Sequence, residues 1–386
     1  MEPKIRFSEF VDNWKNEILG NVTPVKRGVR VTRKDLNSQG KYPVYQNTDY
    51  PMGFYNEYNV KGNSPFVIIG GSAGLIGFSH DNFWAADDCA YFGECEDLDN
   101  VFLYNLLLRQ GSEIKKNVRG SSVPRLDRKI ISDLLISMPS LNEQRQIGNY
   151  FLYLDSLIQS TTKKIESLKQ VKAASLQSMF PQEGETTPRV RFKGFEGDWE
   201  KAIIRDICSF TKGQGYSKSD LKNEGCPIIL YGRMYTSYSF EMNDIDTFAK
   251  HKEGAVYSKG NEVIIPASGE TAEDIAIAAA VRQKGVILGG DLNILVFNDG
   301  YDPSFMALLI SYSKTHYELS KYAQGKSVVH LRNNDIANGH VTCPSMEEQK
   351  QISSFFSKLD SQITLLSQRL EKLKQIKSAC LENMFV

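Results

Sequence analysis

The sequence has 386 residues with 46 basic and 46 acidic side chains, so its formal net charge is zero. A chain of this length exceeds the usual size of one hydrophobic core, which predicts two globular domains with connecting elements. The balanced charge argues against a protein that binds nucleic acid only through bulk electrostatic attraction, but it does not exclude a specific binder. The apolar runs are too short to cross a bilayer, and the N-terminus lacks the apolar segment of a signal peptide.

No metal site or catalytic motif is expected. The six cysteines form no CxxC pair and the five histidines no HxxxH spacing, which is typical of reduced thiols in a cytoplasmic protein. The glycine-rich stretch at residues 69–74 is not followed by the Gly-Lys-Ser/Thr of a P-loop, and no Asn-Pro-Pro-Tyr box is present. We therefore assign no catalytic residue and no cofactor to this chain.

The first predicted domain covers residues 1–138 and has a mixed α/β pattern. A strand is predicted at residues 66–69 and a helix at 101–110. Five cations fall within nine residues, and amide and aromatic side chains follow, a combination suited to phosphates and base edges. The candidate DNA contacts in this domain are Lys26, Arg27, Arg30, Arg33, Lys34, Tyr45, Gln46, Asn47 and Arg125. For any one of them, the alternative is a solvated surface.

A long helix is predicted in residues 139–180. Ser140 and Glu143 have the S-x-x-E spacing of a capping box, in which the serine accepts from the backbone and the glutamate reaches back. Apolar residues then follow the 4-3 spacing of a coiled-coil seam, with one polar interruption at Thr161. The seam residues are Ile147, Phe151, Leu154, Ile158, Ile165 and Leu168. The segment at residues 181–187 is rich in Pro, Gly and Thr and is predicted to be a linker.

The second predicted domain covers residues 188–343, with a strand at 262–265 and a helix at 303–322 that begins at a proline. Its candidate DNA contacts are less dense than those of the first domain. They are Lys212, Gln214, Tyr216, Lys218, Arg233, Tyr235, Lys326 and His330.

The chain ends in a second long helix at residues 344–386, which repeats the first. Residues 139–180 and 344–385 are identical at 20 of 42 positions, and residues 3–14 return in altered form at 188–199. The second seam is unbroken: Ile352, Phe356, Leu359, Ile363, Leu366, Leu370 and Leu373. Because one such helix would leave its apolar seam in water, we expect the two helices to pack on each other, and the repeat predicts an antiparallel pair related by a pseudo-two-fold axis.

The duplicated order of these motifs resembles the specificity subunit of a type I restriction-modification system. The resemblance covers nearly the whole chain. It is carried by Gly120 to Leu126 and Gly325 to Leu331, by Pro139-x-x-x-Glu143-Gln144 and Pro344-x-x-x-Glu348-Gln349, and by Phe7/Trp14 and Phe192/Trp199 at the domain starts.

The resemblance implies a non-enzymatic subunit that binds double-stranded DNA and no cofactor. Two target recognition domains would each read half of a bipartite, asymmetric site, and the helices would set the gap. Two methyltransferase subunits with S-adenosylmethionine would dock on the chain, and restriction subunits would add ATP- and Mg-dependent translocation and cleavage in a bacterial or archaeal cytoplasm. Individual base contacts do not carry over from the family, so the contacts named above rest on residue chemistry alone.

One alternative comes from another functional class: a coiled-coil adaptor whose two domains bind proteins and not DNA. An adaptor would show no salt-sensitive binding to a duplex. A stand-alone methylase or nuclease is a second alternative, and the missing motifs argue against it.

Overall fold

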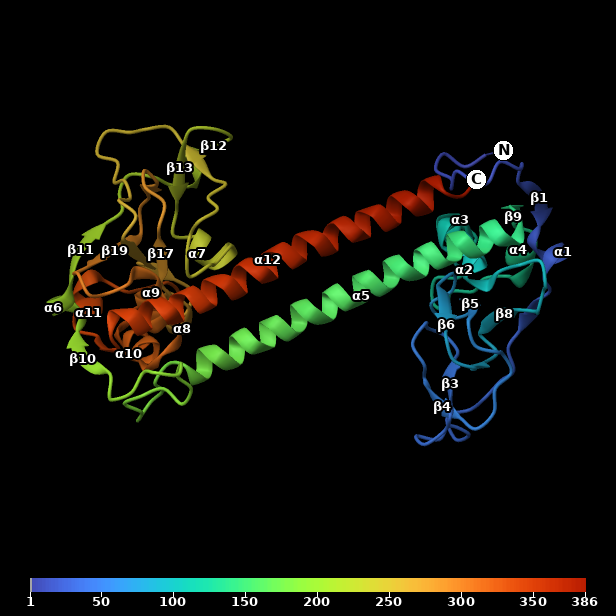
Figure 1. The fold of residues 1–386 in the computed structure, drawn as a ribbon, viewed down its shortest axis with the longest axis horizontal. Helices are drawn as coiled ribbons and strands as arrows, with labels where there is room; N and C mark the ends of the chain where they lie inside the picture. Colours follow the sequence, from blue (N-terminus) through green and yellow to red (C-terminus); the bar gives the residue numbers. More distant parts are fainter. Residues whose placement is uncertain (1) are drawn as a thin grey trace. The chain divides into compact units, whose positions relative to one another are not determined.

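The computed structural model describes residues 2–386 and divides into two compact units (Figure 1). The first unit joins the chain up to Lys164 with Leu366–Val386, and the second comprises Ile165–Leu365. Each unit therefore contains one globular domain together with part of each long helix. The domain limits expected at 138/139 and 343/344 remain predictions, because the division into units falls within the helices.

The first unit is built on a four-stranded antiparallel sheet in the order β2-β8-β5-β6. These strands are β2 (Val25–Arg27), β8 (Cys89–Phe92), β5 (Ser64–Ile68) and β6 (Ile76–Ser79). A second sheet has the order β4-β3-β7, with bounds Gly53–Tyr55, Tyr42–Tyr45 and Trp84–Ala85. The helices of the domain are α1 (Leu19–Val22), α2 (Asn100–Arg109), α3 (Gly111–Lys116) and α4 (Arg128–Ser132), and β1 (Lys15–Ile18) pairs with β9 (Leu135–Met138).

The second unit repeats this architecture. Its main antiparallel sheet has the order β11-β19-β15-β17, with bounds Cys208–Lys212, Leu292–Phe297, Glu262–Pro266 and Ala279–Val281. Its second sheet has the order β12-β14-β13-β18, with bounds Leu221–Lys222, Phe248–Ala249, Cys226–Ile229 and Ile287–Leu288. Two further pairs are β10 (Glu200–Ile203) with β21 (His340–Cys343) and β16 (Ser268–Gly269) with β20 (Val329–His330).

The main helices of this domain are α9 (Pro303–Tyr312) and α10 (Lys314–Tyr322). The shorter ones are α6 (Ile204–Ile207), α7 (Arg233–Thr236), α8 (Ala272–Ile275), α11 (Asn333–Ala337) and the 3-10 turn η1 (Lys218–Asp220). The two globular domains hardly resemble each other in sequence. They nevertheless share one main-sheet topology, with β2 and β11 at the same edge.

The prediction of one helix over 303–322 was wrong. The helix breaks at Ser313, whose backbone is extended (φ −110°, ψ −174°) and whose side chain accepts a hydrogen bond from the N–H of Thr315. Ser313 is thus the N-cap of α10. The other expected elements are present as α2, β5 and β15, within two residues of the expected limits.

The long helices are α5 (Leu141–Ser178) and α12 (Met346–Asn383), each with 38 residues. Of the thirteen predicted seam residues, eight are buried and five half-buried. In the first unit Lys377 on α12 binds Asp155 on α5 at 2.5 Å, and Tyr150 lies 3.8 Å from Cys380. In the second unit Lys172 binds Asp360. Also in the second unit, Phe180, just after α5, lies beside Phe356 on α12. In both units, higher numbers along α5 meet lower numbers along α12, so the helices run antiparallel within each unit.

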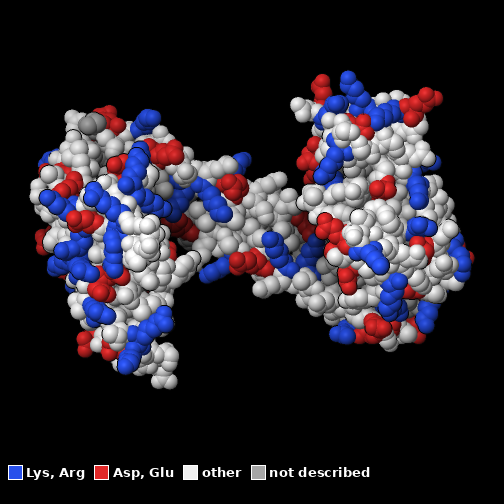
Figure 2. Space-filling model, turned by 180° about the vertical axis from the view of Figure 1, so that it is seen from behind, with Lys and Arg blue, Asp and Glu red and all other residues white. Residues whose placement is uncertain are grey.

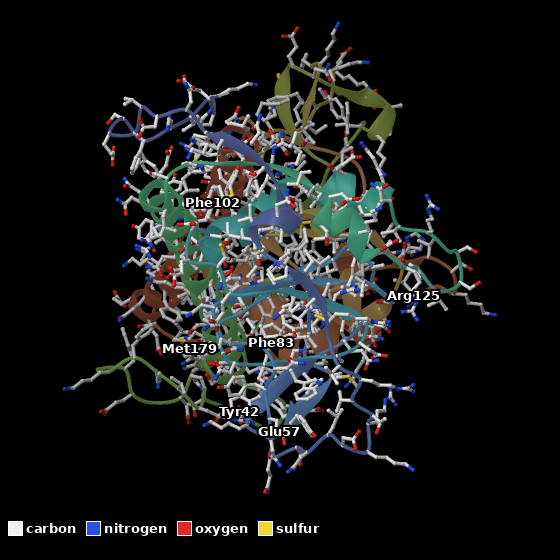
Figure 3. All side chains as sticks on the ribbon, turned by 90° about the vertical axis from the view of Figure 1, so that its right-hand side faces the viewer. Tyr42, Glu57, Phe83, Phe102, Arg125 and Met179 are labelled. Carbon is white, nitrogen blue, oxygen red and sulfur yellow. The ribbon has the colours of Figure 1, made fainter. Side chains whose placement is uncertain are left out.

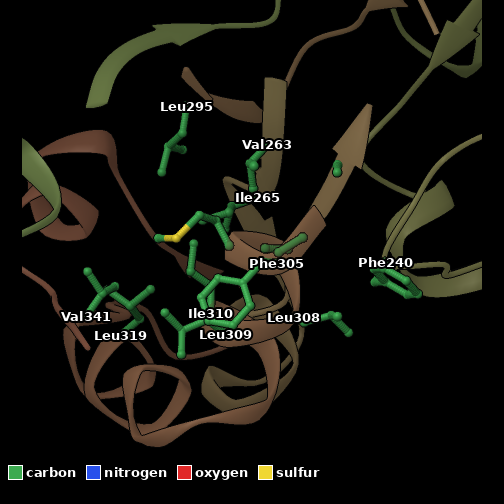
Figure 4. Close-up of a cluster of buried hydrophobic side chains, with 14 of the residues drawn as sticks. Phe240, Val263, Ile265, Leu295, Phe305, Leu308, Leu309, Ile310, Leu319 and Val341 are labelled. Atoms are coloured by element: carbon green, nitrogen blue, oxygen red, sulfur yellow. The ribbon is translucent and has the colours of Figure 1, made fainter. Parts of the chain in front are cut away.

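An aromatic cluster joins both helices to the domain in each unit. In the first unit the ring of Phe385, at the end of the chain, lies 5.3 Å from Phe102 on α2 and 5.9 Å from Phe151 on α5. In the second unit Phe180 lies 5.8 Å from Phe305 on α9 and 6.0 Å from Phe356 on α12. Figure 4 shows Phe305 within the buried apolar side chains of this core.

The capping-box interpretation of Glu143 was wrong in its second half. The Ser140 hydroxyl accepts from the N–H of Glu143 at 3.4 Å, but the carboxylate binds Arg6 through two hydrogen bonds of 2.7 and 2.8 Å. Glu348 binds Arg191 in the same way, with two bonds of 2.7 Å. Both carboxylates are buried and raise the pKa of their arginine partners. Sequence motif Pro-x-x-x-Glu-Gln therefore fastens the start of each helix to its N-terminal segment.

The adjacent glutamine of each motif has an equally structural role. The Gln144 side chain donates to the carbonyls of Asp97 and Pro139 and accepts from the N–H of Asp99. Gln349 makes the same set of contacts in the second unit. Each long helix is thus bound to the turn that precedes α2 or α9.

Within residues 2–386, no helix is both long enough and apolar enough to cross a membrane. The same residues contain no cluster of three or more potential metal ligands.

Candidate nucleic-acid interface

The basic segment of the first domain begins on an edge strand and continues into an exposed loop. Lys26 and Arg27 lie on β2, and the Arg27 Nε donates to the carbonyl oxygen of Asp87 at 2.7 Å. Arg30, Arg33 and Lys34 follow in the loop, exposed and without a hydrogen bond or ion pair to any part of the chain that the structure describes. Three cations are therefore free to meet an anion, whereas Arg27 is partly held by the protein.

The amide and aromatic residues that follow divide between surface and core. Asn47 is exposed and Gln46 is half-buried. Tyr45 is buried, with its ring 4.4 Å from Phe66 and 5.4 Å from Phe83. Since its ring faces are already covered, Tyr45 is not available to stack on a base, and we leave it out of the proposed interface.

Figure 3 shows the end of the first domain that carries β3. Phe83 lies between Phe102, which belongs to the core beside the helices, and Tyr42 with Glu57 at the opposite end. The β3–β4 end of the domain, which carries Tyr42, is therefore remote from the aromatic cluster. Gln46 and Asn47 follow β3 directly, so they belong to the region around the second sheet.

The corresponding loop of the second domain follows the equivalent edge strand, β11. Lys212 ends this strand, and Gln214 and Lys218 lie beyond it; all three are exposed, and their side chains form no hydrogen bond or ion pair within residues 2–386. Tyr216 is buried: its hydroxyl donates to the carbonyl of Lys250 at 3.1 Å. Like Tyr45, it is left out of the proposed interface.

Arg233 and Tyr235 lie on the short helix α7 and have different environments. The Arg233 guanidinium binds Asp246 and the carbonyl of Asp244, and its side chain is only 13% exposed. Both terminal nitrogens of the guanidinium are therefore engaged within the domain. Tyr235 is 38% exposed and donates its hydroxyl hydrogen to the carbonyl of Ser268 at 2.9 Å, and burial raises the pKa of its phenol. The hydroxyl is thus held by the domain while part of the side chain remains in solvent.

The last three candidates lie on or beside loops that occupy equivalent places in the two domains, with His330 on β20. Arg125 forms a backbone bridge with Gly70 and an ion pair with Asp88. His330 pairs with Ser268 on β16, and its Nδ1 lies 3.1 Å from the serine hydroxyl. Lys326 is exposed, with no side-chain hydrogen bond within residues 2–386.

The two domains differ in surface charge on the face drawn in Figure 2. Lysine and arginine side chains predominate over acidic ones on the first domain, at left, whereas the signs are more evenly mixed on the second. This difference agrees with the denser cluster of cations after β2 than after β11.

The sequence reasoning overlooked Arg6, Arg191 and Arg119. The first two occur in the repeated segments Ile-Arg-Phe and Val-Arg-Phe, so the repeat itself was a signal that could have identified them. Arg119 directly precedes the Gly120 loop and has an exposed side chain. Its backbone pairs with that of Arg125, which local sequence does not reveal.

Comparison with known families bears on the whole chain. The model of the type I restriction modification DNA specificity domain matches residues 11–170 and again residues 196–375. The chain belongs to this family. The predictions of a specificity subunit, of its DNA-recognition function and of its non-catalytic nature are confirmed.

Similar specificity subunits occur in archaea and bacteria. The chain is 20% identical over 390 residues to the type I restriction enzyme MjaVIII specificity subunit of Methanocaldococcus jannaschii, covering 95% of this chain and 90% of that protein. It is 22% identical over 267 residues to a putative type I specificity subunit of Mycoplasma genitalium, covering 68% and 69% of the two chains.

The fold is also that of a solved specificity subunit. The crystal structure of the type I restriction-modification S subunit from M. genitalium superimposes with a TM-score of 0.68 at 17% sequence identity, covering 100% of this chain and 99% of that one. The predicted mixed α/β fold with two domains and two long helices is confirmed.

Proposed function

We propose that each domain reads one half of a bipartite, asymmetric DNA site through the loops that follow its edge strand. The observation that supports the proposal is that the two domains share one main-sheet topology but differ in the loops after their edge strands. β2 and β11 occupy the same edge of the same sheet topology, but the side chains that follow differ. The first domain has three free cations after β2, and the second has Lys212 at the end of β11 with Gln214 and Lys218 beyond it. Readers of two different half-sites need this arrangement, because base readout depends on local side chains.

On and after β2 and β3, the proposed contacts of the first domain are those candidates whose side chains are accessible and form no hydrogen bond within residues 2–386; Arg125 is also exposed, but it is paired with Asp88. Lys26, Arg30, Arg33, Lys34, Gln46 and Asn47 form this set. Arginine and lysine suit phosphates or guanine, and Asn and Gln suit adenine. In the second domain the set on β11, after β11 and on α7 is Lys212, Gln214, Lys218 and Tyr235; Lys326 and His330 are also exposed but lie outside these segments, at β20 and the loop before it. Arg27 and Arg233 are weaker candidates because they already donate to backbone or carboxylate oxygens.

The chain would act with partner subunits in the cytoplasm. We infer that two methyltransferase subunits bind it and supply S-adenosylmethionine, and that restriction subunits supply ATP- and Mg-dependent translocation and cleavage. The near-complete match to the specificity family supports these assignments. The zero net charge is consistent with partners that contribute part of the phosphate neutralisation.

Co-expression with the neighbouring methyltransferase, followed by methylome sequencing, tests this proposal. The expected result is co-purification of the two proteins and methylation at one asymmetric site made of two short half-sites and a fixed gap. A protein-binding adaptor would instead leave the methylome unchanged and show no salt-sensitive shift of duplex DNA. Either adaptor result would contradict the proposal.

A further inference from the structure

One exposed loop has the same backbone hydrogen bonds in both domains. The loops that follow β2 and β11, in contrast, differ between the domains. In the first domain Arg119 and Arg125 exchange two backbone hydrogen bonds, of 2.9 and 2.8 Å. In the second domain Gln324 and His330 do the same at 3.0 and 2.8 Å. Each pair closes a loop of five residues, and we call the two the paired loops.

The paired loops are fastened to equivalent strands. The residue after the first loop, Leu126, is buried and donates its N–H to the carbonyl of Ile69, which directly follows β5. The residue after the second, Leu331, is buried and donates to the carbonyl of Ala267, between β15 and β16. Both loops therefore leave the end of the corresponding sheet strand at the same place.

A glycine fixes the shape of each loop. Gly120 and Gly325 have positive φ angles of 92° and 144°. A Cβ atom at Gly325 would lie 1.9 Å from the carbonyl oxygen of Val328, and one at Gly120 would lie 2.8 Å from that of Val123. Only glycine fits such a turn without a shift of the backbone. The sequence thus specifies one conformation for each loop.

This specified conformation presents its tip to solvent. Val123 is 56% exposed and Val328 is 51% exposed, and Ser121, Ser122 and Lys326 are exposed without side-chain hydrogen bonds in residues 2–386. Figure 3 shows Arg125 on a part of the chain that projects from the body of the domain. Core packing does not account for the tips, so their common form points to a common external partner.

The paired loops lie in segments of positive charge, which are bounded by Glu113 and Asp127 in the first domain and by Glu318 and Asp335 in the second. Residues 114–126 contain four cations and no acidic residue, and residues 319–334 contain three cations and no acidic residue. The chain as a whole has equal numbers of both signs. Only Arg125 and Lys116 among these cations have acidic partners, Asp88 and Glu113. Such segments suit a polyanion.

We propose that the paired loops hold the DNA phosphate backbone at both half-sites without reading sequence. The proposal rests on the DNA-recognition function proposed above and names the chemical group that these loops contact. Two half-sites differ in their bases but share the phosphodiester backbone, so a structure common to both domains suits the shared part. Arg119 and Lys326 supply charge, and the Ser121, Ser122 and Ser327 hydroxyls supply further donors.

The double variant Arg119→Ala/Lys326→Ala of the full chain, co-purified with its methyltransferase, tests the proposal. Binding to two duplexes is followed by fluorescence anisotropy over a range of salt concentrations: one duplex contains the site found in the methylome, and the other has a random sequence. Each lost phosphate contact lowers the slope of log K against log salt by about 0.9. We therefore expect a decrease of about 2 on both duplexes, with the methylated site unchanged. Lys15→Ala/Lys201→Ala is the control, because it removes the same charge from exposed positions on β1 and β10.

Three results would overturn the proposal. The slope could equal that of the control variant, the methylated sequence could change, or DNA binding could persist while the methyltransferase no longer co-purifies. The last result would assign the loops to a protein partner. Failure of the function itself looks different, because the wild-type complex would then bind neither duplex in a salt-dependent manner.

Discussion

In the first unit Phe385 packs against Phe102 and Phe151, and in the second Phe180 packs between two phenylalanines at the equivalent positions. The paired Arg–Glu contacts are also repeated, with bonds that agree within 0.1 Å. The segments after the two edge strands, in contrast, have neither the same charge nor the same aromatic residues. The duplication has preserved the contacts that hold each unit together and has left free the loops that we assign to DNA.

The comparison predicts that substitutions at buried seam positions of the long helices lower the stability most. Leu359 lies in the core of the second unit with 7% exposure, whereas its helix neighbour Leu365 is 67% exposed. Leu359→Asp places a carboxylate among apolar partners and should lower the free energy of unfolding by about 4 kcal/mol. Leu365→Asp is the matched control and should change it by less than about 0.5 kcal/mol. Urea denaturation measures both, and equal stabilities would refute the assignment of the seam.

The Arg–Glu contact is expected to be the next most sensitive feature. Glu143 is 2% exposed and also accepts from the Trp14 indole at 3.3 Å, so Glu143→Ala removes the acceptor of the buried indole and the carboxylate partner of the half-buried Arg6, which keeps only its bond to the carbonyl of Asp12. The expected loss is about 3 kcal/mol, typical of breaking a buried ion pair. The exposed pair Lys61–Glu94 is the control, and Glu94→Ala should leave the stability nearly unchanged because solvent screens this pair. Thermal unfolding that ranks the two variants in the opposite order would show that the contact does not fasten the helix.

Lengthening the two long helices tests whether they set the gap while the loops after β2 and β11 determine the half-sites. Seven residues inserted after Thr161 and seven after Leu370 preserve the 4-3 spacing and add about 10 Å to each helix. If the helices set the gap, the methylated half-sites should stay the same while the gap grows by about three base pairs, at about 3.4 Å per pair. Methylome sequencing of cells that carry the variant gives both quantities. A constant gap with altered half-sites would contradict this role of the helices.

Removing charge from the loop after β2 should have the smallest effect on the free energy of unfolding. The variant Arg30→Ala/Arg33→Ala/Lys34→Ala removes three exposed cations that form no internal contact within residues 2–386. Stability should be unchanged, and the salt slope of DNA binding should fall by about 0.9 for each residue that touches a phosphate. A residue that reads a base should instead relax one position of the site, at a cost of about 1–3 kcal/mol. If the triple variant binds DNA with the affinity and salt slope of the wild type, the DNA contacts do not lie in this loop.

Much of the fold could be predicted because its signals are periodic. The 4-3 spacing of apolar residues such as Phe151 and Leu359 can be read within each helix alone. The two helices and their pairing were therefore predictable without knowledge of any distant contact. The common sheet topology was not, since most of its strands have only two to six residues and unrelated sequences. Ser313 was misjudged because neither Gly nor Pro marks the break, although a serine within a helical pattern is a candidate N-cap.

Contacts between distant residues explain the remaining errors. Glu143 fits the capping-box spacing, but its partner Arg6 lies 137 residues earlier in the chain, and local spacing cannot reveal such a pair. Tyr45 and Tyr216 lie among polar loop residues and read equally well as exposed or buried. Only the surrounding rings and carbonyls decide that both are internal.

The central claim is that each domain reads its own half of the site. The most direct measurement replaces residues 188–343 with the equivalent insert of a homologous specificity subunit and sequences the methylome of cells expressing the hybrid with its methyltransferase. The first domain, with its Arg30 and Arg33 loop, is unchanged in this hybrid. We predict that one half-site is retained, the other is replaced and the gap is preserved. Replacement of both half-sites, or of neither, would contradict the claim.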